Sequence, residues 1–245
     1  MTQQSLKSYR VWDRPVRIFH WAAVLTFIPI VALGLVMMFS RDLGISSEDK
    51  VLLKALHIWI GYVFFLNIVV RIIWAFCGNR FARWKAILPF GKVYKAQYAA
   101  YREAGKTKRK INFLGHNPLG RWSVMVMLFL MTAQSVTGLV LGSTDLYMPP
   151  FGSQIKAWVA QDEASMALIV PGDRETGINP EAYQEMRDFR TPYRSWHTYF
   201  FYLLIISVVV HIAAVIRAEK KEGSGLTSGM ITGNKVYSEK PFDAD

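Results

Sequence analysis

Four of the five histidines in this chain of 245 residues lie inside or beside long apolar runs: His20, His57, His197 and His211. An ionisable side chain in such a run is energetically expensive, so its presence favours a functional role. His197 and His211 are 14 positions apart. On one helix they share a face to within about 40° and stand roughly 21 Å apart along the axis. This spacing predicts two histidine sites at two depths.

Facing imidazoles suit a metal that needs only two protein ligands. Zinc prefers four, and neither cysteine nor carboxylate lies near these histidines. Haem iron takes four nitrogens from its own ring and two axial ligands from the protein. The sequence therefore predicts two noncovalent b haems with bis-histidine ligation. One cysteine, Cys77, excludes the two-thiol attachment of a c-type haem. Taken singly, each histidine is equally explained as a hydrogen-bonding residue between helices.

The elements that must position these histidines are four apolar runs, each about as long as the roughly 20 helical residues that cross a bilayer. They cover about 18–39, 53–76, 122–141 and 197–217. The first run is too long and uniform for a cleaved signal peptide, so we expect it to be retained. We therefore expect an all-α membrane protein, a four-helix bundle that forms a single integral membrane domain over 1–245.

The charge balance predicts the orientation of these helices. The chain has 29 lysines and arginines against 18 acidic residues, a net charge of +11. Twenty of the basic residues lie before the first run, in the loop 77–121 or from Arg217 through the tail 218–245, against eight on the opposite side. The positive-inside rule then places both termini and the loop 77–121 in the cytoplasm. The basic run 106–110 is explained by a solvated loop near lipid, and we expect no nucleic-acid partner.

This orientation pairs the histidines by depth. The fourth helix runs inward, so His197 lies near the outer boundary and His211 near the cytoplasmic one. The first helix begins inside, which places His20 with His211. The second begins outside, which places His57 with His197.

Two glycines and one arginine have positions that suit a flat macrocycle. Gly34 and Gly138 lie at the predicted depth of His57, where the lack of a side chain would let a macrocycle approach the helix backbone closely. Ordinary packing of small residues between helices explains these glycines equally. Arg71 lies 14 positions after His57, at the inner depth. It is a candidate partner for a haem propionate, or it snorkels to the cytoplasmic interface.

Bis-histidine iron has no open position, so the chemistry it favours is electron transfer. Two haems across a membrane need a mobile partner, and a membrane quinone is the natural one. Candidate quinone contacts at the cytoplasmic end are His116, Asn117, Arg17 and Arg121. The alternative for this segment is a plain helix start, with Asn117 as the cap and Pro118 at the first position.

The loop 143–195 is too long for a simple connector. It contains the adjacent prolines Pro149 and Pro150, an apolar patch at 155–159 and an acidic, helix-compatible stretch at 181–189. We expect a small folded cap, which is either a docking surface for a periplasmic partner or a lid over the end of the bundle.

Several motifs carry a family resemblance. They are PVRIFHW (15–21), GNRFAR (78–83), GHNPLG (115–120), TG (137–138), SWH (195–197) with His211, and MITGNK (230–235). Together they resemble the b-type cytochrome subunit of membrane-bound nickel–iron hydrogenases and, more broadly, the bacterial cytochrome b561 superfamily.

The resemblance implies a diheme cytochrome of the bacterial inner membrane that passes electrons between a periplasmic redox partner and quinone. Its axial ligands would be the same four histidines. The loop 143–195 is longer than is usual in the hydrogenase subunits, which leaves the partner open between hydrogenase, another oxidoreductase and a c-type cytochrome. The alternatives are a stand-alone quinol oxidoreductase acting on a small oxidant such as superoxide and, in another class, a haem-free transporter or channel. A homodimer is compatible with all of these.

Overall fold

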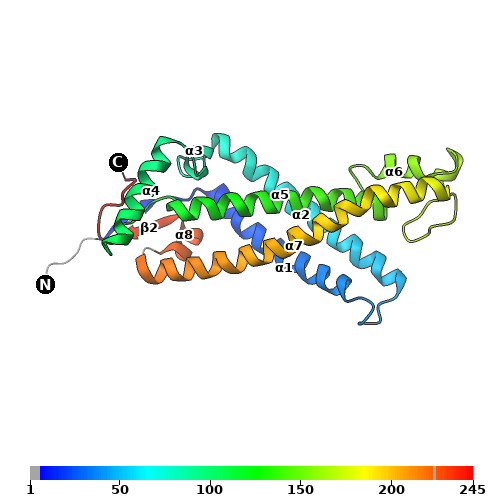
Figure 1. Ribbon diagram of the computed structural model, residues 1–245, viewed down its shortest axis with the longest axis horizontal. Helices are drawn as coiled ribbons and strands as arrows, with labels where there is room; N and C mark the ends of the chain where they lie inside the picture. Colours follow the sequence, from blue (N-terminus) through cyan, green and yellow to red (C-terminus); the bar gives the residue numbers. More distant parts are fainter. Residues whose placement is uncertain (1–5, 223–224, 245) are drawn as a thin grey trace. The chain divides into compact units, whose positions relative to one another are not determined.

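The computed structural model describes residues 6–222 and 225–244, and four long helices dominate it (Figure 1). They are α1 (Arg14–Met38), α2 (Ser47–Cys77), α5 (Pro118–Leu146) and α7 (Pro180–Glu222). The shorter helices are α3 (Trp84–Ile87), α4 (Gly91–Lys106), α6 (Gly152–Val159), the 3-10 helix η1 (Ala164–Ala167) and α8 (Leu226–Thr232). Two short strands, β1 (Lys7–Arg10) and β2 (Asn234–Tyr237), complete the described elements.

The four long helices have the length and composition of membrane spans. Each contains an 18-residue stretch with mean hydropathy between 2.0 and 2.5. Large apolar side chains on these helices are exposed, among them Leu25, Val63 and Ile206. Such exposure is expected where lipid rather than water surrounds the helix. The chain is a multi-pass helical membrane protein, as predicted.

Local capping explains where two of these helices begin. The Asn117 side chain accepts a hydrogen bond from the Gly120 amide (2.7 Å), and Pro118 follows at the first helical position. Asn179 does the same for α7, accepting from the amides of Glu181 (3.0 Å) and Ala182 (3.2 Å). The helix α7 therefore begins well before position 197, and the acidic stretch 181–189 belongs to it.

The chain divides into two compact units, and each long helix contributes to both. The first unit contains the described residues up to Ala22, together with 67–130 and the chain from Leu204 onward. The second contains 23–66 and 131–203. Each is described by itself below.

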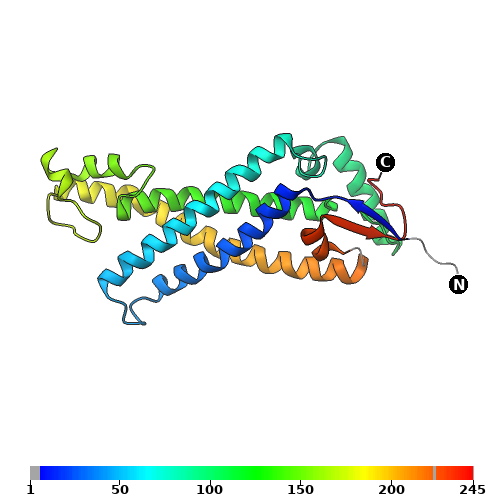
Figure 2. The ribbon, with the colours of Figure 1, turned by 180° about the vertical axis from the view of Figure 1, so that it is seen from behind.

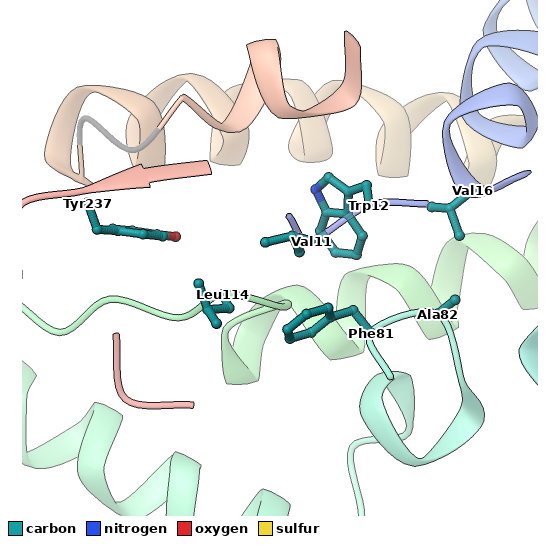
Figure 3. Close-up of a cluster of buried hydrophobic side chains, with 7 residues drawn as sticks. All are labelled: Val11, Trp12, Val16, Phe81, Ala82, Leu114 and Tyr237. Carbon is teal, nitrogen blue, oxygen red and sulfur yellow. The ribbon is translucent and has the colours of Figure 1, made fainter. Parts of the chain in front are cut away.

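The first unit contains a small core that joins residues far apart in the sequence. Strands β1 and β2 pair antiparallel, with Lys7 opposite Tyr237 and Arg10 opposite Asn234, as the blue and red arrows in Figure 2 show. Beside them lies a buried cluster, drawn in Figure 3, which we call the platform. It comprises Val11, Trp12, Val16, Phe81, Ala82, Leu114 and Tyr237.

A glycine makes the turn into β2 possible. Gly233 has a φ of +89°, and its carbonyl accepts from the amides of Val11 (2.8 Å) and Trp12 (3.0 Å). A Cβ at this position would lie 2.6 Å from the Trp12 carbonyl oxygen, so a larger residue would push the two segments apart.

The second unit has its own small core between α6, η1 and the start of α7. Its buried side chains are Ile155, Val159, Ile169, Ile178 and Met186. At the end of α5, Asp145 pairs with Lys54 of α2 (2.5 Å) and with Arg190 of α7 (2.9 Å). This carboxylate therefore ties three helices together beside the cap segment 147–179.

Candidate functional site

Two histidines meet in the second unit. The rings of His57 on α2 and His197 on α7 have centroids 6.4 Å apart and planes inclined by 69°. Metal–imidazole bonds are about 2 Å long, so this separation accommodates one metal atom bound to both rings. We call this pair, with the residues that touch it, the His57 site.

Two α5 side chains define the protonation of His197. The Thr137 hydroxyl donates to the Ala133 carbonyl (2.9 Å) and lies 3.0 Å from His197 Nδ1. Since that hydroxyl has only one proton, it accepts from the Nδ1–H, which leaves Nε2 unprotonated and able to accept a hydrogen bond. The amide nitrogen of Gln134 is 3.0 Å from Nε2 and donates to it. An imidazole fixed at Nδ1 and basic at Nε2 is the form that binds metals.

Glycines lie against both rings of the His57 site. A Cβ added to Gly138 would stand 3.2 Å from His197 Cε1, and one added to Gly34 would stand 3.6 Å from His57 Cε1. Gly61, one turn after His57, has no heavy atom within 4 Å of such a Cβ. The space beside these two rings therefore depends on glycines of α1 and α5.

The other two predicted ligands, His20 on α1 and His211 on α7, belong to the first unit. They lie close enough for their charges to interact, and we call this pair the His20 site. The Nδ1 atom of His20 is buried without a hydrogen bond to the described residues. Next to it, the Phe19 carbonyl accepts from the Asn67 side chain of α2 (3.0 Å), which fixes this turn of α1.

Arg71 is buried rather than extended toward solvent. Only 6% of it is exposed, its Nη1 donates to the Ala82 carbonyl (3.2 Å), and its guanidinium lies 5.9 Å from the centre of the Phe19 ring. A snorkelling side chain would keep its charge in water. The geometry instead gives the first unit a buried cation beside the ring of Phe19, the residue before His20.

Three of the four candidate quinone contacts carry a buried nitrogen that lacks a hydrogen-bond partner among the described residues: Arg17 Nε, Arg121 Nε and His116 Nδ1. The fourth, Asn117, uses its side-chain oxygen to cap α5. Arg121 also donates to Gln97 of α4 (2.5 Å), and the His116 ring packs on Trp12 at 4.8 Å. These residues all belong to the first unit.

Positive charge surrounds His116. Burial, followed by the charges of Lys235, Arg71, Arg121 and His211, lowers the pKa of His116 to about 3. The imidazole is therefore neutral at physiological pH, able to donate or accept a hydrogen bond but not to carry a positive charge.

The donor set of both sites fits haem. Among the residues that the structure describes, no group of three or more His, Cys, Asp or Glu side chains could hold a metal ion. Each histidine pair offers two imidazoles, the axial set that haem iron needs. At the His57 site, the glycine cradle and the basic Nε2 of His197 add to this fit.

Four membrane-spanning helices with paired histidines define a class, the helical membrane cytochromes. The sequence model of the prokaryotic cytochrome b561 family matches residues 11–233. The chain belongs to this family, so it is a membrane cytochrome of the b type and its cofactor is haem b.

The chain is similar over nearly its whole length to proteins named as probable Ni/Fe-hydrogenase B-type cytochrome subunits. The protein of Cupriavidus necator is 23% identical over 243 residues, which cover 96% of this chain and 90% of the relative. That of Azotobacter vinelandii is 26% identical, covering 94% and 89%. The hydrogenase 1 protein of Escherichia coli K12 is 24% identical, covering 94% and 92%. No solved structure gives a significant match.

Several contacts were missed in the sequence analysis. Thr137 was noted only as part of a TG motif, and Gln134 not at all; their spacing of three on one helix face was the available signal. Lys235 stands out in the sequence only as part of the MITGNK motif. Asp243, whose carboxylate accepts from the amides of Leu114 (2.6 Å) and Gly115 (3.1 Å), belongs to no motif.

Proposed function

We propose that this chain is a diheme cytochrome b that carries electrons across the bacterial inner membrane between a periplasmic redox protein and quinone. The observation that carries the proposal is the His57–His197 pair, whose ring separation of 6.4 Å accommodates one doubly ligated metal. The proximity of His20 and His211 supports a second site of the same kind. Both would lie in one integral membrane domain.

Each site has a defined part in this proposal. When bound, haem supplies one-electron oxidation and reduction at an iron whose axial positions are both filled. His57 and His197 would hold one haem, while Thr137 orients the His197 ring. His20 and His211 would hold the other, and Arg71 supplies a buried positive charge beside it. Gly34 and Gly138 leave space at the rings.

The quinone would bind near His116, Asn117, Arg17 and Arg121. The unpartnered nitrogens of Arg17, His116 and Arg121 are donors or acceptors for a carbonyl or hydroxyl oxygen. Because His116 is neutral, its role would be to hydrogen-bond the quinone head group. The basic residues of the loop 77–121 and of both ends support a cytoplasmic location for this region under the positive-inside rule.

The electron donor is proposed from the relatives' names. Since they are named as Ni/Fe-hydrogenase subunits, a hydrogenase of the periplasmic face is the first candidate. The cap segment 147–179 follows the C-terminal end of α5 and would be the docking surface. A c-type cytochrome or another oxidoreductase is the alternative partner.

The experiment is purification in mild detergent, followed by haem content per chain and reduction by a soluble quinol. We expect two haems per chain and reduction of both by quinol, with a periplasmic oxidoreductase copurifying. One haem per chain would remove the diheme assignment. A protein isolated alone that oxidises quinol with superoxide would replace the conduit with a stand-alone oxidoreductase. A haem-free protein would leave only a transporter or channel.

A further inference from the structure

The segment before α5 is irregular yet buried. Asn112, Phe113 and Leu114 are each less than 9% exposed, and none belongs to a helix or strand. Buried main-chain amides and carbonyls need hydrogen-bond partners, because an unpaired group costs about 1–3 kcal/mol. We call residues 112–116 the loop.

The segment 234–243 supplies donors for two loop carbonyls. The Tyr237 hydroxyl donates to the Phe113 carbonyl at 2.7 Å. The ammonium of Lys235 donates to the same carbonyl (3.4 Å) and to that of Gly115 (3.2 Å). Lys235 is only 2% exposed and lies 5.5 Å from the centre of the Trp12 ring. A charged donor makes stronger hydrogen bonds than a neutral one, and a buried charge needs them.

The same segment supplies acceptors for consecutive amides. One carboxylate oxygen of Asp243 accepts from the Leu114 amide (2.6 Å) and the other from the Gly115 amide (3.1 Å). The Phe242 amide donates to the Asn112 carbonyl (2.8 Å). Three carbonyls and two amides of the loop are therefore bonded to a segment about 120 residues later in the chain.

His116 follows this loop directly. Its ring lies on Trp12, and the Trp12 backbone is in turn bonded to Gly233, just before β2. The segment 234–243 thus bonds to the loop residues that precede His116. Gly233, in the turn before this segment, bonds to the backbone of Trp12, on which the His116 ring packs. Any displacement of this segment changes where His116 points.

We propose that the segment 234–243 is a clamp that positions His116 and Asn117 for the quinone, with Lys235, Tyr237 and Asp243 as its positioning residues. This inference rests on the proposed function, because it gives the clamp the quinone site as its target. The clamp residues themselves bond to the loop and need not touch the quinone.

The test compares Asp243→Ala and Tyr237→Phe with Glu239→Ala in the purified, haem-loaded protein. Glu239 is exposed in the same segment, so it serves as the matched control. Hydrogen–deuterium exchange would be measured on peptides covering 112–116. We expect Asp243→Ala to speed exchange of the Leu114 and Gly115 amides about tenfold, since it removes both acceptors. Tyr237→Phe, the milder change, should give a smaller increase, and Glu239→Ala none.

Quinol kinetics supply the functional readout. We expect Asp243→Ala to raise the KM for quinol severalfold while haem content and both haem potentials stay at wild-type values. Unchanged exchange in both clamp variants would overturn the clamp. Faster exchange with unchanged quinol KM would also overturn the proposal, because the loop would be held without its position affecting the quinone. If the wild-type haems are not reduced by quinol at all, the proposed quinone function fails, and exchange reports on the clamp separately.

Where Asp243→Ala yields too little folded protein, Tyr237→Phe decides the outcome alone. It removes one hydroxyl and leaves the ring in the platform. A loss of haem in this variant, rather than a change in quinol KM, would assign Tyr237 to the stability of the platform and would also overturn the proposal.

Discussion

The two histidine sites differ in what surrounds them. At the His57 site the neighbours are neutral: two glycines, a threonine and a glutamine. Three basic side chains are buried in the first unit, which also holds the His20 site: Arg71, Arg121 and Lys235. Among the described residues of the second unit, no charged side chain is as deeply buried. The His57 site is thus lined by neutral, hydrogen-bonding and closely packed groups, whereas the unit that holds the His20 site also holds three buried cations.

Buried positive charge stabilises a reduced, electron-rich centre. If both sites bind haem, the haem of the His20 site should therefore have the higher reduction potential, and electrons should collect in the unit that contains the candidate quinone contacts. The predictions below test this difference, from the largest expected effect to the smallest.

Removing one ligand should empty one site and spare the other. We expect His197→Ala to abolish the haem of the His57 site, and His211→Ala to abolish that of the His20 site, because each deletes an axial ligand. Haem content and the reduced-minus-oxidised spectrum would measure this. The converse result, in which His116→Ala removes a haem and His20→Ala does not, would refute the ligand assignment.

Added methyl groups should weaken the His57 site in a graded way. The Cβ of Gly138→Ala would press on His197 at 3.2 Å and that of Gly34→Ala on His57 at 3.6 Å. Overpacking of this kind costs about 1–3 kcal/mol, so Gly138→Ala should weaken haem retention about tenfold or more, and Gly34→Ala less. Haem loss to apomyoglobin would measure it. Gly61→Ala, in open space, is the control; equal loss in all three variants would argue for general helix packing.

Removing a buried cation should lower one potential. We expect Arg71→Gln to lower the potential of the His20-site haem by roughly 30–60 mV, since about 59 mV is a tenfold change for a one-electron couple. The other haem should change less. Potentiometric titration measures both, with Arg102→Gln on the exposed side of α4 as the control. If only the potential of the His57-site haem fell, the charge of Arg71 would act on that site and not on the His20 site, which would contradict the comparison.

The smallest effect should come from Thr137→Val. The variant removes the acceptor for the Nδ1–H of His197, which makes the imidazole a weaker donor to oxidised iron. The potential of the His57-site haem should rise by a few tens of millivolts, roughly a threefold change in its redox equilibrium. Thr137→Ser keeps the hydroxyl and should restore the wild-type value. An equal shift in both variants would show that the methyl group, not the hydrogen bond, matters.

The sequence predicted what regular helix geometry determines. A spacing of 14 residues places His197 and His211 on one face, and the bias of basic residues pairs them with His20 and His57, because both arguments need only local periodicity and charge. The structure brings His57 to His197 and His20 near His211. The caps at Asn117 and Asn179 are likewise local signals.

The remaining features depend on contacts between distant segments. Strands of four residues each, such as β1 and β2, have no strong pattern of their own, and their pairing joins residues 7–10 with 234–237. The contacts of Arg71, within α2, are equally hard to predict from local sequence. Its depth follows from counting residues, but its hydrogen bond to Ala82 depends on how the chain turns after α2.

The pairing of β1 with β2 also sets an order of assembly. The strand β2 is synthesised after all four spanning helices, and chains fold from the N-terminus while they are being made. Until β2 and the residues after it arrive, the carbonyls of Phe113 and Gly115 lack the donors of Lys235, and Trp12 lacks its bond to Gly233. The platform and the contacts of residues 112–116 are therefore completed only after the residues of all four long helices have been synthesised.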